Sequence, residues 1–345
     1  MKNKKNIIYL CNTEKSASGG AKIIYNHSEI INNLKNYKSQ VIHIKKKKTA
    51  KWKTSFEKRF NPKSSKETGW QLKQIEAAKN FKYNWFQNNI SIKNNLNFDP
   101  DSDFVILPEI FAHLAEDLLI KNGIQYGIFV QNGYSISFTN NEKKLSKAYY
   151  NASFILSYST DITQCIKMNF PKLKTKIIKI KYSIQSKKYN FKTKKKNLIT
   201  FMSRKLPQHS AQVISLLKKH LPKSWQIKDL NNIGEKEVYK NLCRSKIFLA
   251  FSNLEGLPLP PVEAAIAGNY VVGYTGEGGK DYWKKPIFTE IYSGDIRNFV
   301  KQVIKKINEL KLNKKLQSKQ YKILENEFSK KIEIQHIKKF LDYIL

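Results

Sequence analysis

Two glutamates separated by seven residues, Glu255 and Glu263, are the residues whose type and spacing most clearly indicate chemistry. They lie in the stretch FSNLEGLPLPPVEAAIAG, where a buried strand is expected to lead through a glycine-containing loop into a helix. The helix should open on Pro260 and Pro261, where no N–H is needed, carry Glu263 in its first turn, and end at Gly268. Loop amides and a helix N-terminus together favour binding of an anion such as a phosphate.

Carboxylates beside a phosphate site suit one ligand in particular, a nucleotide sugar. Its phosphates are flanked by a ribose on one side and by a sugar on the other, and hydroxyl groups of both can donate hydrogen bonds to carboxylates. The spacing of Glu255 and Glu263 would allow one carboxylate to reach each side. The simpler alternative is an ordinary glutamate near a helix N-terminus, where it compensates the helix dipole.

The same stretch resembles the C-terminal signature of the family 4 retaining nucleotide-sugar glycosyltransferases, which have the GT-B fold. That signature reads roughly EGFGLxxxEAMAxG, and this chain has EGLPLPPVEAAIAG, with Glu255 and Glu263 at the matching positions. Gly256, Leu259 and Gly268 match as well.

Three further stretches are similar to this family. SGGAKIIYNHSEIINNL is similar to its glycine-rich turn and first helix, and the pair Gly19 and Gly20 would let the backbone approach a ligand closely. FMSRKLP falls where the family has GRxxxxKG, whose arginine and lysine neutralise the donor diphosphate. Arg204 matches that arginine, whereas the place of the lysine falls near His209, so that Lys205 is its candidate substitute. GEGGKDY is similar to a later GG-x-x-E loop of the family.

Polar residues also follow two expected strands in the first half of the chain. Glu109 stands just beyond one strand in LPEI, and Gln131 and Asn132 end another in FVQNGY. Both positions lie at the ligand-binding edge of a doubly wound sheet, and some family members resemble the chain here too. We expect these three residues to contact the acceptor or the donor sugar; ordinary capping of strand ends is the alternative.

The resemblance implies transfer of a sugar from a nucleotide-diphosphate sugar to an acceptor, with retention of configuration and without a metal or other cofactor. Arg204, Lys205 and the amides of 257–259 would stabilise the leaving diphosphate, Glu263 would hold the ribose hydroxyls, and Glu255 would orient the donor sugar. The implied acceptor is a cell-surface glycan or a lipid-linked precursor. The expected donor-binding residues are Gly19, Gly20, Arg204, Lys205, Glu255, Gly256, Leu257, Pro258, Leu259 and Glu263.

The elements that would position these residues read as two successive α/β series. Short apolar runs alternate with helical patterns through the first half, and a second series starts at LITFM, from Leu198 to Met202. We expect an α/β protein of two Rossmann-like, doubly wound domains that face a cleft, at 1–185 and 186–328. A helix at 329–345 would cross back to the first domain. Residues 183–197 form a charged linker in this interpretation, and 45–66 form a lysine-rich loop.

Composition excludes several other classes of protein. The 345 residues are 41% hydrophobic, which is enough for substantial cores, and no apolar run approaches the length of a membrane-spanning helix. The N-terminal apolar stretch is too short for a signal peptide. Cys11, Cys165 and Cys243 are widely spaced and suit reduced thiols. These features predict a cytoplasmic protein that could also bind peripherally to the inner face of a membrane.

The net charge of +36 arises from 63 basic against 27 acidic residues, and only four of the basic residues are arginines. Lysine with abundant asparagine and isoleucine indicates AT-rich codons, so composition alone explains most of the charge. An anionic membrane surface or a polyanionic acceptor is the functional alternative. Nucleic acid is not expected as a partner, because arginine is the residue that reads bases and clamps phosphates.

Two rival functions stay open at this point: a GT-B nucleotide-sugar epimerase, and a non-enzymatic polyanion-binding protein. The D-x-D spacing in Asp99–Asp103 resembles a metal-binding element of other glycosyltransferases, but it precedes a strand and contains Pro100, so a turn is expected. Patterns typical of zinc proteases, serine hydrolases and redox dithiols do not occur in the sequence.

Overall fold

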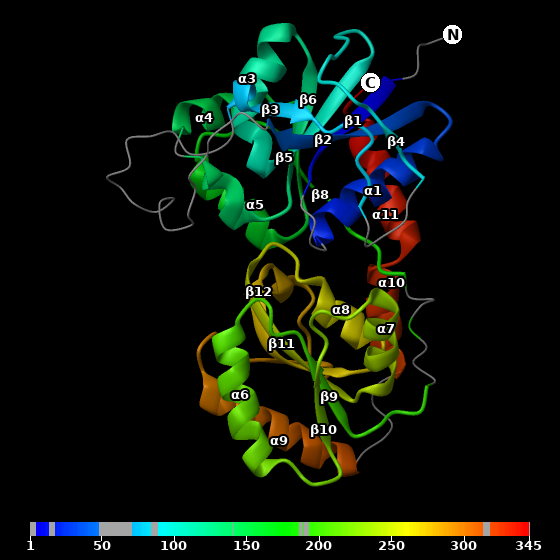
Figure 1. Cartoon of the computed structure of the whole chain (residues 1–345), viewed down its shortest axis with the longest axis vertical. Coiled ribbons are helices and arrows are strands. Elements are labelled where there is room, and N and C mark those ends of the chain that lie inside the picture. The colour runs from blue at the N-terminus through cyan, green and yellow to red at the C-terminus, as the bar shows by residue number, and fades with distance from the viewer. Residues whose placement is uncertain are drawn as a thin grey trace. The chain divides into compact units, whose positions relative to one another are not determined.

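The structure, a computed structural model, describes residues 5–13, 18–47, 71–83, 89–139, 141–185, 189, 193–312 and 318–344. The chain forms two compact units: unit 1 comprises Met1–Ile180 with Ile334–Leu345, and unit 2 comprises Lys181–Glu333 (Figure 1). Most of the loop expected at 45–66 lies outside the described residues; Lys45 and Lys46 end a strand. No helix in the described part of the chain is long and apolar enough to cross a membrane.

Unit 1 is built on an eight-stranded sheet in the order β3-β2-β1-β5-β6-β7-β8, with β4 also paired to β2. All its neighbouring strands are parallel except β2 and β3. The strands are β1 (Lys5–Asn12), β2 (Tyr37–Lys46), β3 (Ile75–Ala77), β4 (Ser91–Ile92), β5 (Asp103–Pro108), β6 (Gln125–Val130), β7 (Phe154–Ser157) and β8 (Ile177–Lys179). From β1 the chain first adds strands on one side and then, from β5, on the other, which is the doubly wound arrangement.

Helices cover both faces of this sheet because its strands bear apolar side chains on both. On β6, Phe129 stacks on His27 of α1 with ring centroids 5.3 Å apart. Tyr126, three residues earlier and therefore on the opposite face, donates its hydroxyl to the Ala148 carbonyl of α4 at 2.6 Å. The helices of unit 1 are α1 (Gly19–Asn32), α3 (Ala115–Leu118), α4 (Glu142–Asn151) and α5 (Thr160–Asn169), with short 3₁₀ segments η1 (Leu72–Gln74), η2 (Glu109–Leu114), η3 (Ile120–Asn122) and η4 (Gly133–Phe138).

Unit 2 is built on a five-stranded, wholly parallel sheet in the order β10-β9-β11-β12-β13. Helices α6 and α9 pack together on one face of it (Figure 1), over a core that includes Phe251 and Phe299, whose rings stack at 5.0 Å. Its elements are β9 (Leu198–Phe201), α6 (Pro207–His220), β10 (Gln226–Asp229), α7 (Glu235–Arg244), β11 (Ile247–Glu255), α8 (Leu259–Ile266), β12 (Tyr270–Glu277), η6 (Gly278–Asp281), β13 (Phe288–Glu290), α9 (Ile296–Leu312) and α10 (Ser318–Glu327).

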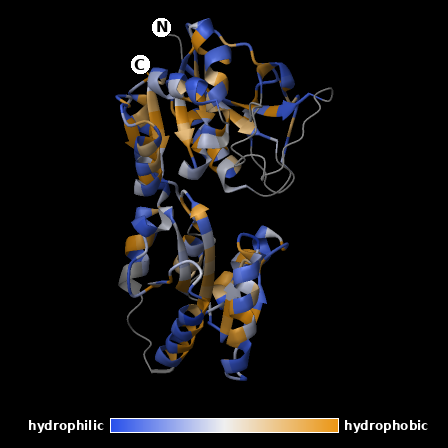
Figure 2. Ribbon diagram, turned by 90° about the vertical axis from the view of Figure 1, so that its left-hand side faces the viewer, coloured by the Kyte–Doolittle hydropathy of each residue, from blue (hydrophilic) through white to orange (hydrophobic). Residues whose placement is uncertain are grey.

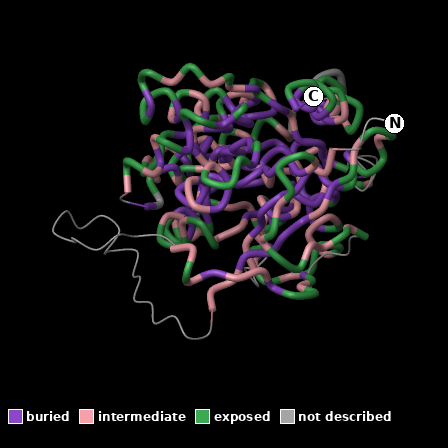
Figure 3. The backbone as a smooth tube through the Cα atoms, turned by 90° about the horizontal axis from the view of Figure 1, so that it is seen from above, coloured by how far each residue is buried: buried purple, intermediate pink, exposed green. Residues whose placement is uncertain are grey.

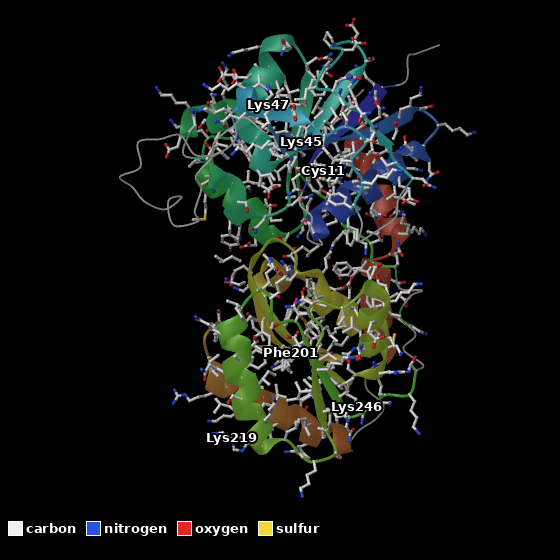
Figure 4. The ribbon with its side chains drawn as sticks, in the orientation of Figure 1. Cys11, Lys45, Lys47, Phe201, Lys219 and Lys246 are labelled. Carbon is white, nitrogen blue, oxygen red and sulfur yellow. The ribbon has the colours of Figure 1, made fainter. Side chains whose placement is uncertain are left out.

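Hydropathy and burial follow the sheets in both units. Figure 2 shows hydrophobic residues along the strands and hydrophilic ones over much of the helices. Figure 3 shows buried stretches of backbone alternating with exposed ones along the tube. In Figure 4, Cys11 and Phe201 are labelled close to the ends of β1 and β9, the strand from which each sheet is extended in both directions. The prediction of two parallel, doubly wound α/β domains is therefore confirmed.

The last helix, α11 (Lys330–Leu341), joins the core of unit 1, where Phe340 lies 5.7 Å from the ring of Phe154. The units divide at 180 and 333, whereas the sequence suggested 185 and 328. Contacts within unit 2 account for the difference, since Ser183 donates to the buried carboxylate of Glu333 at 2.5 Å and Lys181 pairs with Glu327 at 2.5 Å.

The expected linker at 183–197 is more tightly held than its composition suggests. Lys195 donates its ammonium group to the carbonyls of Leu242 and Ala267, at the ends of α7 and α8, and burial lowers its pKa to about 8. A lysine is suited to this place because the last carbonyls of a helix lack partners within the helix. The described part of this segment is therefore packed against unit 2.

Candidate functional site

Strands β9 and β11 of unit 2 are neighbours, and their carboxyl ends carry the residues expected to do chemistry. The chain leaves β9 for β10 on one side of the sheet and later returns to β11 on the other, so the gap between β9 and β11 is the topological switch point. Ligands of open parallel sheets bind in the crevice at such a point. Lys205 follows β9, Glu255 ends β11, and their side chains form an ion pair across the switch point at 2.9 Å.

The loop that follows Glu255 is held in place by the loop after β12. A Cβ atom on Gly278 would lie 1.9 Å from the carbonyl oxygen of Gly256, so only glycine allows the two backbones to approach this closely. The buried hydroxyl of Tyr282 donates to the Pro258 carbonyl at 2.5 Å. The GEGGKDY stretch thus packs against the loop that follows Glu255 and supports it.

Helix α8 differs from its prediction at its first turn. It begins at Leu259 with Pro258 as N-cap, so Glu263 is its fifth residue and lies in the second turn, not the first. The reason is that Pro260 and Pro261 are accommodated as the second and third helical residues, where no N–H partner is required. Because Pro258, Pro260 and Pro261 have no N–H, few backbone donors are left for an anion at this helix end. The end of the helix is as expected, since Gly268 has φ +88°.

Glu263 is half-buried and lies among tyrosines of unit 2. Burial first, and the charge of Glu263 second, raise the pKa values of Tyr182 and Tyr189. The ring of Tyr189 in turn packs edge-on against Tyr239 at 4.9 Å. Tyr182 and Tyr189 therefore lie close enough to Glu263 to be influenced by its charge.

Arg204 is exposed next to the Lys205–Glu255 pair and, within the described residues, forms no ion pair or hydrogen bond. Its guanidinium is therefore available to a ligand. His209, which stands near the place of the family lysine, instead directs its Nδ1 to the hydroxyl of Tyr274 at 3.3 Å. Lys205, the candidate substitute for that lysine, lies at the switch point.

In unit 1, the predicted residues Glu109, Gln131 and Asn132 form one cluster at the carboxyl ends of the neighbouring strands β5 and β6. Glu109 is buried, and its two carboxylate oxygens accept the backbone amides of Gln131 at 2.9 Å and of Asn132 at 3.2 Å. Burial raises the pKa of Glu109 to about 7, although these two hydrogen bonds oppose the shift. Glu109 therefore acts on the shape of the loop after β6.

Gly20 belongs to the same cluster and also lies at a topological switch point, since β1 and β5 are adjacent. The Gln131 side chain donates to the carbonyl of Gly20 at 3.1 Å, and a Cβ on Gly20 would lie only 2.1 Å from the Gln131 Oε1 atom. The glycine that the sequence marked for close approach is thus needed for contact with Gln131. Gly19 is the first residue of α1.

Sequence reasoning missed β10 and with it Asp229, which accepts the Ser203 hydroxyl at 2.5 Å and shapes the loop that leads to Arg204. The short alternation of apolar and polar residues in WQIK, from Trp225 to Lys228, was the available signal. It also missed Leu254, which has φ +45° and is 50% exposed immediately before Glu255. A left-handed conformation at a branched residue is strained, and such strain concentrates at functional sites.

The described residues contain no cluster of three or more side chains that could hold a metal ion. The D-x-D spacing of Asp99–Asp103 lies in a turn, as expected, where Asp99 accepts the Ser102 hydroxyl at 2.6 Å.

No protein-family model and no curated protein matches this chain. Several solved structures match over nearly the full length of both chains. HepE of Anabaena, solved in complex with UDP-glucose, is 10% identical with a TM-score of 0.65, over 98% of this chain and 99% of HepE. Sucrose-phosphate synthase of Thermosynechococcus elongatus is 7% identical with a TM-score of 0.64, over 99% of each chain. A TarM variant of S. aureus, in a complex containing UDP, is 12% identical with a TM-score of 0.62, over 98% and 99%.

At these identities the likeness concerns the fold. The chain has the two Rossmann-like domains and the C-terminal helix of the GT-B fold, which confirms the fold class and the structural resemblance expected from the sequence.

Proposed function

We propose that this protein is a glycosyltransferase that takes its sugar from a nucleotide-diphosphate sugar bound at the switch point of unit 2. The observation that carries the proposal is the ion pair between Lys205 and Glu255 at the carboxyl edge of a parallel sheet. Arg204 precedes Lys205 and has no ion pair or hydrogen bond among the residues that the structure describes. A carboxylate next to two cations matches a ligand that has both hydroxyl groups and a diphosphate. The GT-B fold supports this assignment by analogy.

In this proposal the cations and the acids bind different parts of the donor. Arg204 and Lys205 bind the diphosphate and stabilise the negative charge that develops as it leaves. Glu255, freed from Lys205 by the donor, orients the transferred sugar, and Glu263 holds the ribose. The few amides left at 256–259 add to the positive potential. Retention of configuration and independence of metal are part of the proposal, because they follow from the sequence resemblance.

Unit 1 binds the acceptor in this proposal. Glu109 holds the loop after β6 through two backbone amides, and that loop carries Gln131, whose side chain donates to Gly20, and Asn132, whose side chain caps η4. Amide side chains donate and accept at once, which suits hydroxyl-rich molecules. The proposed acceptor is accordingly a glycan or a lipid-linked precursor.

A thermal-shift screen of UDP-, GDP-, ADP- and TDP-sugars tests the proposal first, because a ligand that binds only the folded chain raises its melting temperature. The nucleotide sugars that bind are then incubated with the protein, with and without candidate glycan acceptors. The products are separated by mass and by the anomeric configuration of the transferred sugar. We expect one nucleotide class to stabilise the protein and its sugar to appear on an acceptor.

Two outcomes would contradict this function. Conversion of the bound nucleotide sugar into an epimer without any acceptor would identify an epimerase on the same fold. Absence of stabilisation by every nucleotide sugar, together with binding of polyanions that falls steeply with salt and is unaffected by substitution of Glu255, would identify a polyanion-binding protein.

A further inference from the structure

One surface of unit 1 combines exposed apolar side chains with lysines. Met168, in the last turn of α5, is 80% exposed, and Tyr150, in the last turn of α4, is 43% exposed. Four exposed lysines accompany them on α5 and on the loop to β8. We propose that this surface docks the protein onto a lipid membrane with anionic headgroups. We call it the α5 tip, and it consists of Tyr150, Lys167, Met168, Lys172, Lys174 and Lys176.

The lysines of the α5 tip keep their charge unpaired within the part of the chain that the structure describes. No aspartate or glutamate occurs from Ile162 to Lys181. The ammonium groups of Lys167, Lys172, Lys174 and Lys176 form no ion pair or hydrogen bond with any described residue. Other lysines of the same segment do have partners, since Lys179 donates to Thr160 and Lys181 pairs with Glu327. The four lysines of the tip are therefore free to attract an anionic surface.

The backbone of the α5 tip is held in place by packing and hydrogen bonds, so Met168 is exposed on an ordered surface. Phe170 is buried and stacks on Tyr149 of α4 at 4.2 Å, and it meets Tyr150 edge-on at 6.3 Å. Thr175 donates to the Tyr149 carbonyl at 2.9 Å, and the Lys176 carbonyl accepts the amide of Ile155 at 2.9 Å. A preformed surface loses little conformational entropy on binding.

The mixture of side chains favours a membrane over a soluble polyanion. Lysine stems can lie along an apolar boundary while their ammonium groups stay among headgroups, and tyrosine is enriched at the membrane interface. Against a sugar-phosphate or polyphosphate backbone, Met168 would stay in water. The tip contains no arginine, the residue that clamps phosphates most specifically.

The position of the tip leaves the candidate acceptor cluster of the same unit uncovered. Helix α5 starts at the carboxyl end of β7 and ends at the amino edge of the sheet, where β8 begins. Glu109 and Gln131 lie at the opposite, carboxyl edge. The inference does not depend on the proposed function, because it rests on this surface alone.

Sedimentation of the full chain with vesicles tests the inference. The vesicles are phosphatidylcholine alone, or phosphatidylcholine with 30% phosphatidylglycerol, in 50 mM and 500 mM salt. We expect binding to the anionic vesicles at low salt and little binding to the neutral ones. Each lysine near such a surface is worth a factor of about five, so the double variant Lys172→Gln/Lys174→Gln should bind about 25-fold more weakly. Met168→Ser should weaken binding about tenfold.

The matched control is Lys218→Gln/Lys219→Gln, which removes the same charge from exposed positions at the end of α6 in unit 2, where Figure 4 labels Lys219. It should bind within about twofold of the unaltered chain. The inference is overturned if the control loses as much binding as the tip variant, or if the unaltered chain ignores anionic vesicles at low salt. It is also overturned if Met168→Ser binds anionic vesicles as well as the unaltered chain does, while binding of long-chain polyphosphate requires Lys172 and Lys174. That result would identify the surface as a polyanion site.

Discussion

The ammonium group of Lys205 lies 2.9 Å from the carboxylate of Glu255, and the two side chains reach each other from the ends of adjacent parallel strands. Lys205 and Glu255, fifty positions apart in the sequence, thus meet at the topological switch point of the sheet. Both side chains retain access to solvent, at 45% and 18% exposure, so a ligand can separate them. The pair shows that the cation and the acid expected to bind one nucleotide sugar already share a site.

Replacing Lys205 with alanine should weaken binding of the donor far more than it weakens the fold. A charge-assisted hydrogen bond to a phosphate is worth about 1.5–3 kcal/mol, so the affinity for the nucleoside diphosphate should fall about 10- to 100-fold. Stability should change by less than about 1 kcal/mol, since the ion pair is exposed. Lys228→Ala is the control, because Lys228 pairs with Glu237 at similar exposure, 42%, away from the switch point. Equal affinity losses in the two variants would contradict this role of Lys205.

Glu109→Gln should change how stability depends on pH. Burial raises the pKa of Glu109 from 4.5 to about 7, so the folded chain holds this proton more tightly than the unfolded chain does. Stability from this group is therefore present below pH 4.5 and lost as the pH rises through 7, by up to about 3 kcal/mol. Glu109→Gln does not titrate, so its stability does not fall with pH for this reason. Its side-chain N–H₂ group also faces a backbone N–H donor, which lowers the stability of the variant at every pH.

Urea unfolding of both proteins between pH 4.5 and 8.5 measures this difference. The stability advantage of the unaltered chain over Glu109→Gln should shrink with rising pH, while all other titrating groups cancel between the two. A constant difference across the whole range would show that Glu109 stays ionised in the folded protein.

Gly278→Ala should disturb the loop that carries Glu255. The new Cβ would stand 1.9 Å from the Gly256 carbonyl oxygen, which is backbone and cannot swing aside. We expect a destabilisation of about 1–3 kcal/mol and loss of most donor affinity, measured by calorimetric titration. Gly234→Ala adds the same methyl group where nothing lies within 4 Å, and should bind the donor normally. Full donor affinity in Gly278→Ala would show that this loop contact has no part in binding.

Gly20→Ala should lower turnover without lowering stability. The added Cβ meets only the end of the Gln131 side chain, which can move, and alanine is a better helix former than glycine by about 1 kcal/mol. If Gln131 contacts substrate, its displacement should reduce turnover at least tenfold, measured as release of nucleoside diphosphate. Gln131→Ala should cause the same loss, and the double variant no further loss. Full activity in Gly20→Ala would show that Gln131 does not contact the substrate.

Features that depend on a short stretch of sequence could be predicted without the structure. Glu255, Gly256 and Gly268 follow from one continuous stretch, and the alternation of apolar runs was enough to predict two parallel α/β domains. The sequence alone could not show that Lys205 meets Glu255, because that contact depends on which strands become neighbours. Nor could it show that Glu109 is buried against two backbone amides. The start of α8 was misplaced because three prolines permit several starts, and β10 was missed because its residues are mostly half-exposed and polar.

Calorimetric titration measures whether a nucleotide sugar binds at the ends of β9 and β11. The nucleotide sugar that stabilises the protein is titrated into the unaltered chain, Arg204→Ala and Glu263→Ala. Arg297→Ala, at an exposed position of α9, is the control for loss of one arginine. We expect one binding site, affinities at least tenfold weaker in Arg204→Ala and Glu263→Ala, and unchanged affinity in the control. Unaltered affinity in both site variants would contradict binding at this site.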